Sequence, residues 1–162
     1  MYGYGKFQGS RTQLESAITL AYDTYGTVVD SNSKLVWKRY RSTQASIDGI
    51  VPVTSGDSIV NAVVAVSNYL GADFNAVSYM EQGHTAVETF DNISGVHGIS
   101  LTGITYEKAL SYVGDGSPVI ARIGEDEYII ITAYNSSEIA YIEASTGAQK
   151  TVSMNEAGKM FS

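Results

Sequence analysis

The chain of 162 residues contains no cysteine, only two prolines and only two histidines. The absence of cysteine excludes disulfides, thiolate metal sites and a cysteine nucleophile. No apolar run reaches the roughly 18 residues that span a bilayer, so we expect no membrane insertion, and the N-terminus lacks the apolar core of a signal peptide. No glycine-rich phosphate loop occurs, so we expect no nucleotide cofactor.

Charge is divided unevenly along the chain, whose formal net charge is −7. Residues 1–50 carry six Lys and Arg against four Asp and Glu, whereas residues 51–162 carry four against thirteen, which gives +2 and −9. Nucleic acids and anionic membranes require phosphate neutralisation by Lys and Arg, so the acidic body argues against both as the main partner.

A basic and aromatic stretch in the first part of the chain has two interpretations. Its members are Lys34, Lys38, Arg39 and Arg41 around Trp37 and Tyr40. One interpretation is a nucleic-acid patch. The other, which we favour, is a hairpin strand that buries Trp37 and leaves its charges in solvent or against the acidic body.

The first 41 residues predict a small strand-helix-hairpin unit. Residues 2–8 are typical of a strand, and the Thr12 and Glu15 pair of a capping box precedes apolar positions at helical spacing up to Tyr25. Gly26 then supplies a helix stop. Strands are expected at 27–30 and 35–37, around the polar turn 31–33. Residues 42–52 are interpreted as a linker, because 41–49 is polar and aperiodic.

A buried helix is predicted after the linker. It begins with Asp57 or Ser58 as N-cap, is apolar around most of its circumference and stops at Gly71. Shorter helices are expected over 75–81 and 85–90, and a firmer one starts at the Thr105 N-cap.

The C-terminal part predicts an antiparallel meander. Apolar stretches joined by tight turns of Gly, Asp, Asn and Ser indicate strands near 119–123, 128–133, 139–142 and 149–152. The stretch 128–133 is apolar almost without a break, which is typical of a central strand covered on both faces. Ser153 and Glu156 then form a capping box for a last helix that carries Met160 and Phe161 inward.

The run SPVIARIGEDEYIIITAYNSSEIAYIEASTG resembles the bacteriocin-processing (double-glycine) peptidases of the papain-like cysteine peptidase superfamily. In that family a G-x-P-V-I strand, an H-Y-V-V-V-T-G-Y strand and a D-P-x-x-G turn follow one another. The resemblance spans about residues 51 to 162. It implies an α+β papain-like fold over 53–162, in which a buried central helix packs on an antiparallel sheet.

Residues 1–41 are similar to an accessory unit that precedes such degenerate peptidase-like domains in exported proteins of Gram-positive bacteria. The matching features are the aromatic-glycine opening, the A-I-x-L-A helix and the G-T-V-V and V-W-K-R strands. The similarity implies an extracellular or cell-surface location.

The residues at the family's catalytic positions depart from its pattern. The nucleophile position falls on Ser58, the histidine position on Glu127 and the aspartate position on Glu143, with Ala144 in place of proline. The glutamine of the oxyanion hole falls near Pro52. We therefore expect no catalytic residue here, and Ser58 in the ordinary role of a helix cap. The resemblance then implies a catalytically inactive domain that acts as a binding or interaction module.

Negative charge at Asp57, Glu127 and Glu143 favours a cationic peptide or protein partner. Two other functions stay open. Ser58 with His84 or His97 would make a serine-dependent hydrolase, and a purely structural module would use the split charge to hold its two parts together. The acidic run 125–127 lacks the alternating oxygen ligands of a calcium loop, so a solvated turn is favoured over a metal site.

Overall fold

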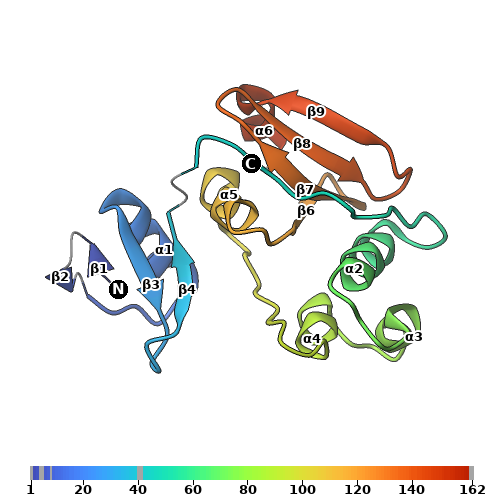
Figure 1. Ribbon diagram of the computed structural model, residues 1–162, viewed down its shortest axis with the longest axis horizontal. Helices are drawn as coiled ribbons and strands as arrows, with labels where there is room; N and C mark the ends of the chain where they lie inside the picture. The colour runs from blue at the N-terminus through green and yellow to red at the C-terminus, as the bar shows by residue number, and fades with distance from the viewer. Residues whose placement is uncertain (1, 4–5, 8, 40–41, 161–162) are drawn as a thin grey trace.

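The computed structural model of the chain describes residues 2–3, 6–7, 9–39 and 42–160. The fold is mixed α+β with two antiparallel sheets, as Figure 1 shows. The first sheet belongs to the N-terminal unit, and the second is the framework of the rest of the chain. Among the described residues, no helix has the length and hydropathy needed to cross a bilayer.

The N-terminal unit is a four-stranded sheet covered by one helix. Its strands are β1 (Tyr2–Gly3), β2 (Lys6–Phe7), β3 (Gly26–Val29) and β4 (Leu35–Lys38), in the order β2-β1-β3-β4. Helix α1 (Leu14–Asp23) packs on β3 and β4 and buries Ile18 and Ala21 completely. The predicted helix and hairpin are therefore confirmed.

Three details of this unit differ from the prediction. Residues 2–8 do not form one strand, because β1 and β2 pair antiparallel with each other; residues 4, 5 and 8 lie outside the described part. The N-cap of α1 is Gln13 rather than Thr12, and no side chain caps the helix there. The left-handed residue after the helix is Tyr25 (φ 54°), not Gly26, which already belongs to β3. The Arg39 guanidinium lies 4.1 Å from the Tyr25 ring centre and helps to hold it.

The second sheet is the predicted meander with one added strand. It consists of β5 (Ala45–Ser46), β6 (Val119–Ile123), β7 (Glu127–Tyr134), β8 (Glu138–Glu143) and β9 (Gln149–Ser153). Strand β7 pairs with β5, β6 and β8, so it is the central strand. Its three consecutive isoleucines, 129–131, are at most 1% exposed. Both faces of the strand are thus covered, as predicted.

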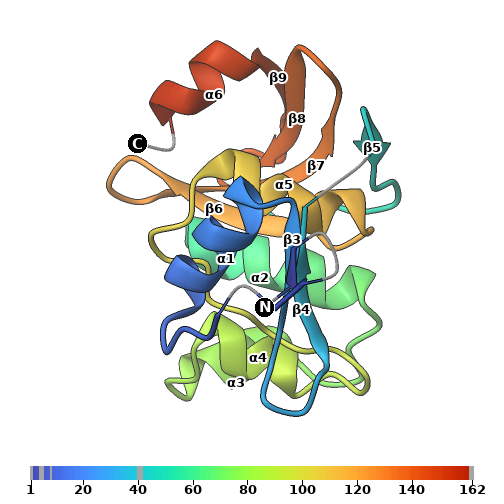
Figure 2. The same cartoon turned by 90° about the vertical axis from the view of Figure 1, so that its left-hand side faces the viewer.

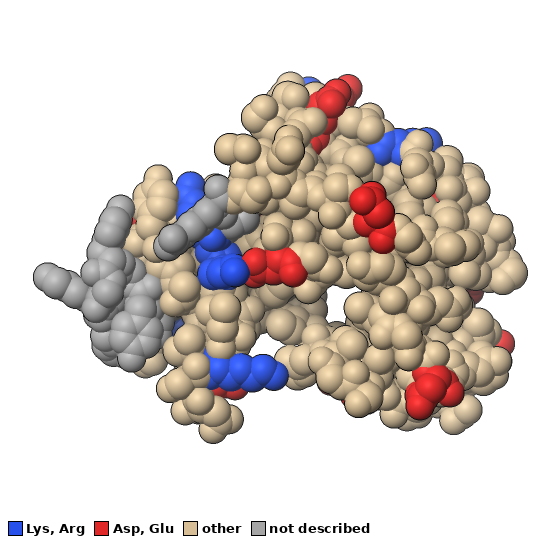
Figure 3. Space-filling view, in the orientation of Figure 1, with Lys and Arg blue, Asp and Glu red and all other residues tan. Residues whose placement is uncertain are grey.

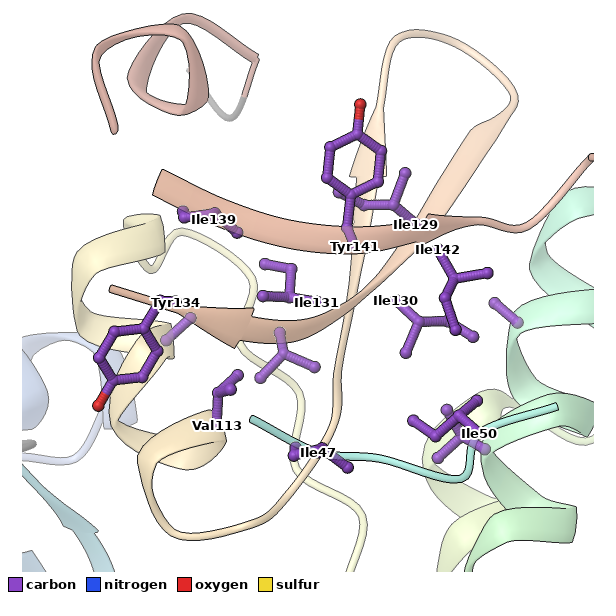
Figure 4. Close-up of a cluster of buried hydrophobic side chains, with 14 of the residues drawn as sticks. Ile47, Ile50, Val113, Ile129, Ile130, Ile131, Tyr134, Ile139, Tyr141 and Ile142 are labelled. Atoms are coloured by element: carbon purple, nitrogen blue, oxygen red, sulfur yellow. The ribbon is translucent and has the colours of Figure 1, made fainter. Parts of the chain in front are cut away.

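The segment interpreted as a linker contributes to the body of the fold. Strand β5 pairs with the end of β7, and Ile47 and Ile50, each 7% exposed, belong to the main core. Figure 4 shows both side chains among the isoleucines of β7 and β8. A two-residue strand and two isolated isoleucines are too short a pattern for a period to be recognised.

Within residues 42–160, five helices complete the body, at the predicted places. They are α2 (Ser58–Tyr69), α3 (Ala76–Glu81), α4 (Ala86–Asp91), α5 (Tyr106–Gly114) and α6 (Met154–Met160). Residues 61–67 of α2 are all buried, and the helix packs against β7. The Ser153 and Glu156 capping box is present, with Met160 partly buried. Phe161 lies outside the described residues.

The N-terminal unit contacts the body through α5. In Figure 2 the N-terminal unit lies in front of this helix. The Trp37 indole N–H donates to the Lys108 carbonyl (3.0 Å), and the Tyr112 hydroxyl donates to the Val36 carbonyl (3.1 Å). Trp37 is 2% exposed, so the favoured interpretation of the hairpin is confirmed for this residue. Lys38 forms an ion pair with Asp115 of the acidic body (2.8 Å). Tyr40 and Arg41 lie outside the described residues.

Candidate functional site

The start of α2 meets the start of β7 through the side chain of Ser58. The Ser58 hydroxyl donates to Glu127 Oε1 (3.2 Å) and accepts the backbone N–H of Tyr128 (2.8 Å). Two of the three positions that the sequence pointed to are therefore in direct contact. Ser58 does not cap its helix as expected: the N-cap is Asp57, without a side-chain hydrogen bond, and the Ser58 hydroxyl instead ties the helix to the sheet.

Glu143, the third position, lies at the same end of the sheet at the close of β8. It is paired in register with Ile129, two residues beyond Glu127. Its carboxylate accepts hydrogen bonds from Lys150 Nζ (2.6 Å) and Thr146 Oγ1 (2.6 Å). Hydrogen bonding from Lys150 and then from Thr146 lowers the pKa of Glu143 below its usual value.

Lys150 changes the electrostatics that the sequence suggested for this place. Its pKa is raised, chiefly by the hydrogen bond to Glu143, and Glu127 contributes to the same shift. The ammonium group thus pairs with the Glu143 carboxylate and lies within electrostatic range of Glu127. The negative field expected around Ser58 is partly neutralised. Sequence reasoning missed Lys150 because it lies on the neighbouring strand β9, and only the β8–β9 register brings it near Glu143.

Asn61 is a second residue that sequence reasoning missed. It is 1% exposed, and its side-chain amide bonds the N–H of Gly56 (2.8 Å), the carbonyl of Gly56 (2.8 Å) and the carbonyl of Ala144 (3.0 Å). These bonds fix the loop before α2 to the turn after β8, so Asn61 sets the position of Ser58. An asparagine inside an otherwise apolar run was the available signal.

The other positions carried over from the resemblance lie beside this turn. Ala144 is 3% exposed and donates its N–H to the Tyr128 carbonyl (2.9 Å). Pro52 borders Gly147, at which a Cβ would lie 3.0 Å from the proline Cβ. The proline offers no side-chain donor there.

Neither histidine is a hydrogen-bond partner of Ser58. His97 Nδ1 lies 2.8 Å from Asp91 Oδ1. The His84 ring stacks on Tyr79 at 3.9 Å between centroids, and its Nδ1 lies 3.9 Å from Glu88 Oε2. Each imidazole thus has a local partner on α3 or α4. The geometry gives no support to a hydrolase built from Ser58 and either histidine.

No group of three or more potential metal ligands occurs in the described parts of the chain. Residues 124–126 of the acidic turn between β6 and β7 are exposed, and Arg122 donates to the Glu125 carbonyl. This arrangement is that of a solvated turn.

A hollow of about 890 Å³ lies between the N-terminal unit and the body. Figure 3 shows an opening there, enclosed by surrounding atoms, below α5 and beside α2 in the orientation of Figure 1. Side chains from β4, α2, α4, α5 and β6 line it, together with the connection 96–104. Tyr112 lies in this wall, and burial raises its pKa to about 12.

Two features hold the connection 96–104 against α4: hydrogen bonds to Asp91 and a close backbone approach at Gly98. Asp91 Oδ1 accepts both the Gly98 N–H (2.9 Å) and His97 Nδ1. The Gly98 bond, followed by the His97 bond, lowers the pKa of Asp91. At Gly98 a Cβ would lie 2.6 Å from the Val87 carbonyl oxygen, so only glycine permits this close approach.

The hollow and the Ser58 contact adjoin each other. Ile59, the residue after Ser58, and Tyr128, the residue after Glu127, both line the hollow.

A comparison with family models, with curated proteins and with solved structures gave no match to the chain.

Proposed function

We propose that the chain is a catalytically inactive papain-like domain that acts as a binding or interaction module of an exported bacterial protein. One observation carries the proposal: the Ser58 hydroxyl lies between a carboxylate and a backbone N–H, with no imidazole as partner. A serine nucleophile needs a positioned general base. In a serine triad that base is an imidazole, and here Ser58 contacts the Glu127 carboxylate instead.

Two further features support the proposal. Ser58, Glu127 and Glu143 come from the start of the buried helix, the start of the central strand and the end of the next strand, as the resemblance requires. The adjoining hollow has a volume within the range of ligand sites, about 300–1,000 Å³. The chain thus has a place for a ligand next to a site without catalytic chemistry.

Two variants with a cysteine at position 58 test whether Ser58 and Glu127 occupy the catalytic positions of the family. In Ser58→Cys with Glu127→His, an imidazole beside the thiol lowers the thiol pKa, whereas in Ser58→Cys alone the carboxylate raises it. At pH 7 we expect the double variant to react with iodoacetamide about tenfold faster, since one pKa unit changes the thiolate fraction about tenfold. The native chain has no cysteine, so the label reports position 58 alone. Equal rates would overturn the placement.

Two measurements separate the proposal from its alternatives. A fluorophosphonate probe is expected to leave the native chain unlabelled, and labelling that disappears in Ser58→Ala would establish a serine hydrolase instead. A panel of uncharged and cationic peptides and of muropeptides is expected to contain a ligand that raises the melting temperature by several degrees. A flat response across the panel would favour a purely structural module.

A further inference from the structure

The hollow runs along the free edge of a β-strand. Strand β6 pairs with β7 alone, and within residues 9–39 and 42–160 none of its backbone groups forms a hydrogen bond with another element. Consecutive side chains of a strand point to opposite faces, so a hollow on one face would be lined by every second residue. Here residues 117–122 all line the hollow without a gap. The edge itself, with its N–H and C=O groups, therefore borders the space.

A second sheet edge borders the same hollow but is already occupied. Residues 35–38 of β4, an edge strand of the N-terminal sheet, also line it consecutively. The Tyr112 hydroxyl donates to the Val36 carbonyl of that strand. The edge of β6 has no such cap, and it begins after Pro118, a residue confined to strand ends and edges.

The remaining walls are suited to an uncharged chain with apolar side chains. Leu70, the residue after α2, offers apolar surface together with Val87 and Phe90 of α4. The polar groups of the wall have partners: Lys38 pairs with Asp115, Arg122 donates to the Glu125 carbonyl, and His97 Nδ1 lies 2.8 Å from Asp91 Oδ1. The opening visible in Figure 3 gives a linear ligand room to enter and leave.

We propose that the hollow binds an extended, uncharged peptide segment, which adds as a strand to the free edge of β6. The five residues of β6 match about five residues of peptide, about 17 Å long. The inference rests on the proposed binding function and names its ligand class. It places the ligand along β6 rather than over Ser58.

A fluorescent peptide provides the test. The probe is an acetylated octapeptide of alternating valine and threonine with a dansyl group at its C-terminus. Trp37, the single tryptophan, lines the hollow, so its energy transfer to dansyl reports binding at this place. We expect saturable transfer with the native chain. Absence of saturable transfer would overturn the inference.

Backbone methylation distinguishes strand addition from apolar binding. In an added strand only every second residue directs its N–H toward β6. Two probes, one N-methylated on the valines and one on the threonines, should therefore differ: one loses about tenfold or more in affinity, and the other keeps it. Equal affinities, or saturable binding of 1-anilinonaphthalene-8-sulfonate with none of the peptide, would overturn the inference.

Two variants locate the site. Ser100→Phe fills the hollow from an exposed loop position and should abolish the transfer. Thr151→Phe adds the same ring at an exposed position of β9, outside the hollow, and should leave it unchanged. Equal effects of the two substitutions on the energy transfer would overturn the inference. Cleavage of the probe that depends on Ser58, seen by chromatography, would instead overturn the proposed function, whereas an intact and unbound probe would overturn the strand addition alone.

Discussion

Asn61→Ala is the substitution whose cost the structure defines best. The change removes three hydrogen bonds from a side chain that is 1% exposed. Each bond contributes about 1 kcal/mol net, and alanine returns about 0.6 kcal/mol or less of helix propensity. We therefore expect a loss of about 2–3 kcal/mol in the free energy of unfolding, a large share of the 5–15 kcal/mol typical of a domain.

The same helix offers a matched control. Ser67 is fully buried in α2, and its hydroxyl has no hydrogen-bond partner among the described residues. Ser67→Ala introduces the same residue at the same depth without breaking a bond. Its free energy of unfolding should change by less than about 0.5 kcal/mol or should rise.

Urea unfolding of both variants measures the difference. With a urea dependence of about 2 kcal/mol per molar, the midpoint of Asn61→Ala should fall by roughly 1–1.5 M, and that of Ser67→Ala should stay close to the native value. Midpoints within about 0.2 M of each other would refute the reasoning that Asn61 ties the loop before α2 to the turn after β8.

Three other predictions concern the site and the hollow. Because hydrogen bonding lowers the pKa of Glu143, its contribution to stability is present above the usual value of 4.5 and disappears as pH falls through the lowered one. Glu143→Gln should therefore lower the urea midpoint at pH 7, by an amount that shrinks as pH falls below 4.5, whereas Glu138→Gln, at the exposed end of β8, should leave the midpoint unchanged in both pH ranges. Burial raises the pKa of Tyr112 to about 12, so the free energy of unfolding should fall between pH 10 and 12 in the native chain and should fall less in Tyr112→Phe. Unfolding followed by circular dichroism measures the difference; an equal dependence on pH in both proteins would contradict the burial of the Tyr112 hydroxyl. Gly98→Ala should lower the melting temperature because its Cβ meets a carbonyl oxygen. Gly158→Ala in α6, whose Cβ would lie 3.6 Å from the Tyr106 ring, should raise the melting temperature because alanine has the higher helix propensity; a rise in both variants would contradict the close approach at Gly98.

Much of the fold is predictable because its elements carry local signals. The consecutive isoleucines of β7, the capping box before α6 and the apolar circumference of α2 each require a particular local structure. Where local signals were weak or in competition, the prediction was wrong. Thr12 offered a capping box that α1 does not use. The helix ends at Asp23, and Tyr25 rather than Gly26 takes the left-handed conformation, in contact with Arg39, the residue after β4.

The candidate site was predictable only in part. Ser58 and Glu127 were named through the resemblance to the peptidase family, and they are in contact. Their partners were not predictable, because Lys150 reaches Glu143 through a strand register and Asn61 reaches Ala144 across 83 residues of sequence. The role of Ser58 itself changed, from a helix cap to a link with β7.

The sequence by itself determined the absence of thiol chemistry, the order of helices and strands, and the burial of α2 and β7, since composition and periodicity act along the chain. Tertiary structure alone decided which strand edges of the second sheet are paired and that the outer edge of β6 is not. The segment 42–52 covers the end of β7 through β5, while β6 keeps a free edge beside the hollow. Strand pairing joins residues that are distant in sequence, so no local pattern records which edge will find a partner.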